Sequence, residues 1–147
     1  MLSPLFISEE DMTNSELIAI ALKAREFSYS PYSGFSVGAA LECKDGTVYS
    51  GCNIENAAYG PGNCAERTAI FKAVSEGHKD FLKIAIVGGT TGKPIEGYAY
   101  PCGVCRQVMM EFAEYDKFVI LVAKTPTDFK EYTLKELLPD GFGPDNL

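Results

Sequence analysis

The chain has 147 residues, of which 46% are hydrophobic and 22% charged, and its formal net charge is −7. These values predict a single soluble globular domain over residues 1–147, long enough to bury roughly two thirds of its unfolded surface. The acidic balance argues against a nucleic-acid partner, because a phosphate backbone requires a basic patch. A membrane partner is not expected either, since no apolar run approaches the ~20 residues of a membrane-spanning helix.

Cysteine usage points to a reducing compartment. The chain contains five cysteines, an odd number, at positions 43, 52, 64, 102 and 105. Residues 1–11 lack the basic start of a signal peptide. An odd count without a secretory signal argues against a disulfide framework, so we expect a cytoplasmic protein.

The first predicted elements are a helix and a β-hairpin. Thr13-Asn14-Ser15-Glu16 has the pattern of a capping box and opens the helix. Alternating apolar residues predict a strand over 35–41, Asp45-Gly46 predicts a hairpin turn, and 48–53 would be the returning strand. The apolar stripe of the helix consists of Leu17, Ile20, Ala21, Ala24 and Phe27.

Two further helices flank a strand that is apolar on both faces. A helix is predicted from about Cys64 to Glu76, with Gly77 as its stop, after a loop over 56–62. Residues 84–87 are typical of a strand buried inside a parallel sheet. The next helix is predicted over 103–115, with the apolar residues Val104, Val108 and Phe112 on one side.

The C-terminal part supplies one more buried strand and a short helix. The apolar run 118–123 would pair with the strand over 84–87 through a right-handed crossover. Thr133-Leu134-Lys135-Glu136 is a second capping box, and Pro139 closes its helix. Together the elements predict an α/β fold with a mixed sheet, in which a hairpin leads into parallel strands and helices cover the faces.

Two short motifs combine three thiols with one carboxylate: Cys64-Ala65-Glu66-Arg67 and Pro101-Cys102-Gly103-Val104-Cys105. Three thiolates suit Zn²⁺ and leave its fourth tetrahedral position open, which is typical of a catalytic site. Water bound at that position ionises near neutral pH and becomes a nucleophile. Glu66 lies close enough in sequence to reach such a water without having to bind the metal.

The expected helices also supply positive charge to this cluster. Both motifs should lie at helix N-termini, where the helix dipole offsets part of the negative charge of three thiolates. Arg67 could donate hydrogen bonds to the sulfurs and add a full charge.

The same motifs have simpler interpretations. A lone C-x-x-C pair could be a redox centre, but the third cysteine and Glu66 favour zinc. Cys52 could supply a fourth thiolate and close the site, although its strand position favours core packing. Glu66 could be merely a carboxylate favoured at the start of a helix.

Three runs around these motifs resemble the small zinc-dependent cytidine deaminases of pyrimidine salvage. The resemblance extends from about Asn14 to Phe142. The runs are Gly51-Cys52-Asn53-Ile54-Glu55-Asn56-Ala57-Ala58-Tyr59, Asn63-Cys64-Ala65-Glu66-Arg67-Thr68-Ala69 and Pro101-Cys102-Gly103-Val104-Cys105-Arg106-Gln107.

The resemblance implies a three-layer α-β-α sandwich around a mixed five-stranded sheet. It also implies hydrolytic deamination of cytidine and deoxycytidine to uridine and deoxyuridine, with release of ammonia. Cys64, Cys102 and Cys105 would hold one zinc ion. Glu66 would take a proton from the zinc water and deliver protons to the base N3 and to the departing amino group.

Further residues would contact the nucleoside by the same resemblance. Asn53 and Glu55 would hold the ribose hydroxyls, and the backbone around Ala65 would bind the edge of the base. Phe35 would lie against the pyrimidine. Taken alone, Asn53 and Glu55 would suit a strand end and a solvated loop, and Phe35 would suit the core.

The small members of this family are homotetramers, so a homotetramer with shared active sites is expected. Phe142 of one subunit would then cover the base in a neighbouring site. Without the resemblance, the C-terminal tail would be expected to fray and leave Phe142 solvated. Tyr49 could cross the same interface or could be a surface residue of its strand.

Two positions depart from the family pattern. Tyr100 stands where a small serine is common, and Gly60-Pro61-Gly62 is an unusual form of the loop before Cys64. Fine substrate preference therefore stays open. The alternatives are a deaminase of a modified nucleoside, of the blasticidin type, and a non-enzymatic zinc module with Cys52 as fourth ligand.

Overall fold

The computed structural model describes residues 12–147, and the expectation that residues 1–11 are not a signal peptide lies outside this range. No helix in the described part of the chain is long and apolar enough to cross a membrane. The helices are α1 (Asn14–Arg25), α2 (Ala65–Ser75), α3 (Gly103–Phe112), α4 (Leu134–Leu137) and the 3₁₀ helix η2 (Pro144–Asn146). The strands are β1 (Phe35–Cys43), β2 (Val48–Cys52), β3 (Phe81–Thr90), β4 (Val119–Thr125) and β5 (Asp128–Thr133).

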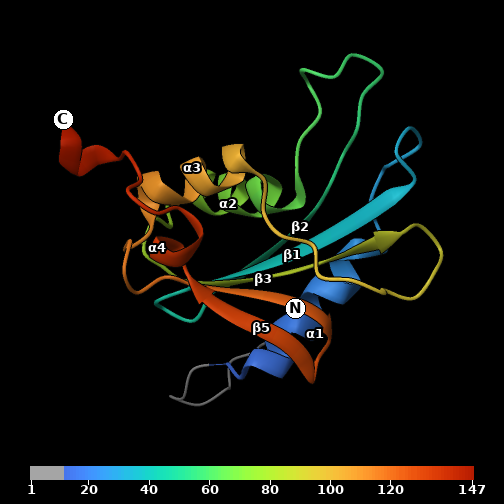
Figure 1. Ribbon diagram of the computed structural model, residues 1–147, viewed down its shortest axis with the longest axis horizontal. Helices are drawn as coiled ribbons and strands as arrows, with labels where there is room; N and C mark the ends of the chain where they lie inside the picture. Colours follow the sequence, from blue (N-terminus) through green and yellow to red (C-terminus); the bar gives the residue numbers. More distant parts are fainter. Residues whose placement is uncertain (1–11) are drawn as a thin grey trace.

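The strands form one mixed five-stranded sheet in the order β2-β1-β3-β4-β5. Only β3 and β4 run parallel, while the other three pairs are antiparallel. Helix α1 lies on one face, and α2, α3 and α4 lie on the other (Figure 1). The expected three-layer α-β-α arrangement is therefore confirmed.

Alternation along the strands separates two apolar cores. On β1, Ala40 faces the core beneath α1, where Leu17 and Ile18 are fully buried. Its neighbours Ala39 and Leu41 point to the opposite core, which packs against α2 and α3. Residues of β3 and β4 are buried on both faces, as the doubly apolar runs predicted.

The predicted helix starts are confirmed by their hydrogen bonds. Thr13 and Glu16 form the complete capping box of α1, and Thr133 and Glu136 form that of α4. Gly77, just after α2, has φ +94, which is the left-handed backbone that favours glycine after a helix.

Some expectations about individual elements are wrong. Helix α1 ends at Arg25, so Phe27 leaves the apolar stripe and is 73% exposed. On α3, Cys105 and Met109 are buried, whereas Val104 is 57% exposed. The sequence pattern also gives no sign of β5, because this edge strand is largely polar and exposed.

Two glycines allow the helices to lie close to the sheet. A Cβ atom at Gly38 would lie 2.1 Å from the Ala21 carbonyl oxygen of α1. A Cβ atom at Gly51 would lie 2.6 Å from the Ala69 nitrogen of α2. Any larger residue would push a helix outward, and α2 carries one of the two cysteine motifs.

Candidate metal centre and active site

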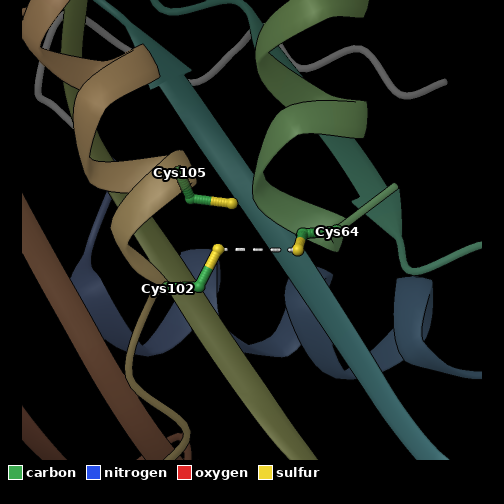
Figure 2. A group of neighbouring side chains, drawn as sticks. All are labelled: Cys64, Cys102 and Cys105. Carbon is green, nitrogen blue, oxygen red and sulfur yellow. Dashed lines mark hydrogen bonds between the residues drawn. The ribbon is translucent and has the colours of Figure 1, made fainter. Parts of the chain in front are cut away.

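Three cysteine sulfurs meet between the first turns of α2 and α3. The Sγ atoms of Cys64, Cys102 and Cys105 all lie within 4.8 Å of one another. Figure 2 shows the three side chains converging, with Cys64 and Cys102 joined by a contact of 3.8 Å. Tetrahedral zinc with Zn–S bonds of ~2.3 Å holds its sulfurs about 3.8 Å apart. The donor type and spacing therefore fit one zinc ion.

Helix geometry explains how the thiols reach one point. Cys64 is the N-cap of α2 and Cys102 is the N-cap of α3, and both have extended backbones. Neither side chain caps its own helix by a hydrogen bond, so both thiols remain available. Cys105 lies one turn into α3 and is fully buried. Two helix N-termini thus point partial positive charge at the cluster.

Arg67 connects the two halves of the cluster. Its Nη2 donates to Cys64 Sγ at 3.1 Å, and its Nε donates to Cys105 Sγ at 3.4 Å. A hydrogen bond from the Cys105 thiol, together with Arg67, lowers the pKa of Cys64. The same shared hydrogen bond and burial raise the pKa of Cys105. The site therefore favours a thiolate even before metal binding, and deprotonated thiols are the form that binds zinc.

Glu66 is a buried carboxyl group beside the sulfurs. Only 4% of the residue is exposed, yet it lines the same cavity as Cys64 and Cys102. Burial raises the pKa of Glu66 to about 7. A carboxyl group poised near neutral pH can both accept and donate a proton, which suits a general acid–base.

A cavity of about 380 Å³ is lined by two of the three cysteines, Cys64 and Cys102. Apolar and polar groups share its wall, as in small-molecule sites. The predicted contact residues Phe35, Asn53, Glu55 and Ala65 all line it. The other lining residues are Val37, Ile54, Tyr59, Gly62, Asn63, Cys64, Glu66, Arg67, Ile86, Ala99, Tyr100 and Cys102.

Asn53 is held firmly at the end of β2. Its Oδ1 accepts hydrogen bonds from the Val37 amide at 2.9 Å and from the Ser28 hydroxyl at 2.5 Å. Its Nδ2 donates to the Phe35 carbonyl at 2.9 Å. A second N–H of the amide is left to donate to a ligand.

Glu55 is fixed by the turn that precedes β1. One carboxylate oxygen accepts from the amides of Tyr32 and Ser33, and the other accepts from the Ser33 hydroxyl. These bonds lower the pKa of Glu55, the Ser33 hydroxyl being the largest cause. Glu55 therefore stays an anionic acceptor at the mouth of the cavity.

Two other predicted residues lie elsewhere. Phe142 is 58% exposed and does not line the cavity of its own chain. Tyr49 is buried, and its hydroxyl contacts Glu76 and His78, so the alternative of a surface tyrosine is excluded. Among the described residues, the possible metal-binding group does not include Cys52, which leaves the closed four-thiolate site unsupported.

Two serines that hold the contact groups in place are not recognisable from the sequence. Ser28 and Ser33 do not touch the sulfurs, yet they bind Asn53 and Glu55 across 25 and 22 residues of sequence. Short-range periodicity carries no signal for such pairs, because their partners come from different elements.

The comparisons with known proteins agree with this geometry. The family model described as the cytidine and deoxycytidylate deaminase zinc-binding region matches residues 11–122. This chain belongs to that family. A cytidine deaminase of Sporosarcina psychrophila is 48% identical over 136 residues, covering 92% of this chain and 96% of the relative. One of Halalkalibacterium halodurans is 50% identical and covers 92% of this chain and 98% of the relative.

Solved structures of this deaminase family share the fold. The crystal structure of cytidine deaminase from Burkholderia pseudomallei has a TM-score of 0.80 at 46% identity, covering 89% of this chain and all of that one. The enzyme from Mycobacterium tuberculosis has a TM-score of 0.73 at 36% identity, covering 90% of this chain and 99% of that one. The zinc-binding region of the family contains the cysteine cluster, since both motifs fall within the matched residues.

Proposed function

We propose that this chain is a zinc-dependent deaminase that hydrolyses cytidine and deoxycytidine to uridine and deoxyuridine, with release of ammonia. One observation carries the proposal: two of three cysteine sulfurs with zinc spacing, those of Cys64 and Cys102, line the same cavity as the buried Glu66. The close relatives that cover almost the full chain are cytidine deaminases, which supports the same substrate class.

In the proposed mechanism, Cys64, Cys102 and Cys105 would hold a zinc ion, which would supply the Lewis acidity that makes a nearby water molecule acidic. Glu66 would accept one proton of that water while the water oxygen bonds to C4 of the base, and would deliver this proton to N3. It would then take the proton of the new C4 hydroxyl and give it to the amino group, so that the C4–N bond breaks, ammonia leaves and the C4 carbonyl of the product forms. A pKa of about 7 suits this double role, because the group passes between its two protonation states at neutral pH.

The remaining lining residues would hold the nucleoside. Glu55, as a fixed carboxylate, would accept a hydrogen bond from a ribose hydroxyl, and the free N–H of Asn53 would donate to one. Phe35 is 42% exposed and would place its ring against the pyrimidine. The backbone at Ala65 would contact the edge of the base.

The function is tested by incubating the purified protein with cytidine and measuring uridine and ammonia. We expect both products in equal amounts and about one zinc per chain by elemental analysis. Glu66→Gln should retain zinc and bind cytidine, yet lose several orders of magnitude in kcat. Glu111→Gln, an exposed carboxylate change on α3, is the matched control. Near-normal turnover by the Glu66 variant would refute the mechanism.

We further propose a homotetramer in which Phe142 completes the site of a neighbouring subunit. Gln107 Nε2 donates to the Phe142 carbonyl at 2.8 Å, so the tail is guided along α3. In Figure 1 the C-terminal segment leaves the fold beyond the end of α3, away from the N-termini that hold the cysteines. An exposed ring that does not reach its own cavity is available to cover another.

The setting we propose is pyrimidine salvage in the cytoplasm. All five cysteines are free thiols in the structure. Thiols that bind zinc must stay reduced, which the cytoplasm maintains.

A further inference from the structure

A pair of tyrosines connects the cavity wall to the edge strand of the sheet. The hydroxyl of Tyr100 lies 2.9 Å from that of Tyr132, and the two rings meet edge to face at 5.7 Å between centroids. Tyr100 lines the cavity and lies two residues before Cys102. Tyr132 belongs to β5, which contributes none of the lining residues.

The segment before Cys102 contains no regular secondary structure. Residues 91–102 form neither helix nor strand and lead the chain from β3 back to the start of α3 (Figure 1). Cys102 itself is exposed, and its side chain makes no capping hydrogen bond. The Arg106 amide donates to the Cys102 carbonyl at 3.0 Å, so α3 holds Cys102 from one side, and the residues before it supply the contacts on the other side.

Those contacts come from β5 and from α4, which directly follows it. Tyr132 pairs with Ile120 in the β4–β5 ladder, so its ring lies on the same face of the sheet as α3. Arg106 adds a second connection, because it donates to the Pro101 carbonyl at 2.7 Å and to the Leu137 carbonyl of α4 at 2.5 Å. The tyrosine pair thus connects Tyr100 to β5, and Arg106 connects the next residue, Pro101, to α4.

We propose that Tyr132 is a positioning residue for the zinc ligand Cys102, acting through the side chain of Tyr100. The two hydroxyls share one hydrogen bond, and the edge-to-face contact fixes the ring of Tyr100 relative to β5. Small displacements of a ligand weaken metal binding strongly, which is why residues behind the ligands affect metal affinity. The inference rests on the proposed metal site, but its test measures zinc release and not deamination.

The experiment follows zinc transfer from the purified holoenzyme to a coloured chelator. Tyr132→Phe and Tyr100→Phe each remove one hydroxyl and keep the ring. Each should release zinc about fivefold faster than the wild type, the change expected from loss of one hydrogen bond. The double variant should resemble the single variants, since either change already breaks the shared bond. The visible spectrum of cobalt-substituted protein should shift in the same variants.

Two tyrosines provide matched controls. The Tyr98 hydroxyl also reaches β5, because it donates a hydrogen bond to Asp128 at 2.6 Å. Tyr98 lies farther along the chain from Cys102 than Tyr100 does. Tyr115 donates to the Leu138 carbonyl at 2.6 Å and does not line the cavity. Tyr98→Phe and Tyr115→Phe should both release zinc within about twofold of the wild-type rate, which separates positioning from general loss of stability.

Three results would overturn the inference. The first is unchanged zinc release and cobalt spectrum in Tyr132→Phe. The second is an equal acceleration in either control variant. The third is a multiplied effect in the double variant, which would mean that the hydroxyls act independently. Failure of the wild type to deaminate cytidine would refute the proposed function and leave this measurement intact.

Discussion

The guanidinium of Arg67 donates to the sulfur of Cys64, three residues earlier in the chain, at 3.1 Å. The same side chain reaches Cys105 on the other helix, so one cation contacts both halves of the cysteine cluster. Three thiolates exceed the charge of Zn²⁺ by one unit. Arg67 is thus placed to offset the surplus charge and to orient two of the three ligands.

Removing this cation should weaken metal binding. We expect Arg67→Gln to release zinc at least about tenfold faster than the wild type, in the range seen when groups behind metal ligands are removed. Lys72→Gln is the control, since it removes a charge from the same helix without contacting a sulfur. Chelator competition measures both rates, and an unchanged rate for the Arg67 variant would exclude its role at the metal.

The carboxyl of Glu55 should titrate below the ordinary range of glutamate. Its pKa is lowered chiefly by the Ser33 hydroxyl, so the charged form favours the folded protein. This stabilisation is present above the unfolded pKa near 4.5 and disappears as the pH falls through the lower folded pKa. Carbon-detected NMR titration should show a low midpoint that rises in Ser33→Ala. A midpoint at or above the ordinary value in the wild type would contradict the hydrogen-bond pattern.

A methyl group at position 51 should destabilise the protein. In Gly51→Ala the Cβ would lie 2.6 Å from the Ala69 nitrogen and 2.7 Å from the Ala65 carbonyl, so α2 must move. We expect a loss of about 1–3 kcal/mol in the free energy of unfolding, measured with urea. Gly97→Ala is the control, because its added Cβ meets no atom within 4 Å. Equal stability of the two variants would show that α2 adapts without cost.

Shared active sites can be tested by mixing inactive subunits. A Glu66→Gln protein lacks the proposed acid–base, and a protein truncated after Asp140 lacks Phe142. If Phe142 completes a neighbouring site, exchange of subunits should restore partial activity, because some sites then combine an intact Glu66 with an intact tail. Light scattering should also show a tetramer.

The point variant Phe142→Ala gives an independent measure of the same contact. It should raise the KM for cytidine about fivefold and keep zinc, since a stacked ring contributes about 1 kcal/mol. In the mixing experiment, no recovery of activity despite proven subunit exchange would show that each chain builds its site alone.

The local sequence determined the helices, the buried strands and the chemistry of the motifs. Both capping boxes could be identified because their partners lie three residues apart. The C-x-x-C spacing places Cys102 and Cys105 on one side of the first turn of α3, since residues three apart are neighbours on a helix. The doubly apolar run at 84–87 indicated a buried parallel strand for the same short-range reason.

Only the tertiary structure decided which residues surround those motifs. Cys64 and Cys102 are 38 residues apart in sequence, and the sheet brings their sulfurs to 3.8 Å. The burial of Tyr49, the exposure of Val104 and the pairing of Tyr100 with Tyr132 each depend on elements far away along the chain. The edge strand β5 gave no local signal, because its polar residues become a strand by pairing with β4. Such contacts follow from how layers pack and which segments the folded chain brings together, and residue spacing within one element does not encode them.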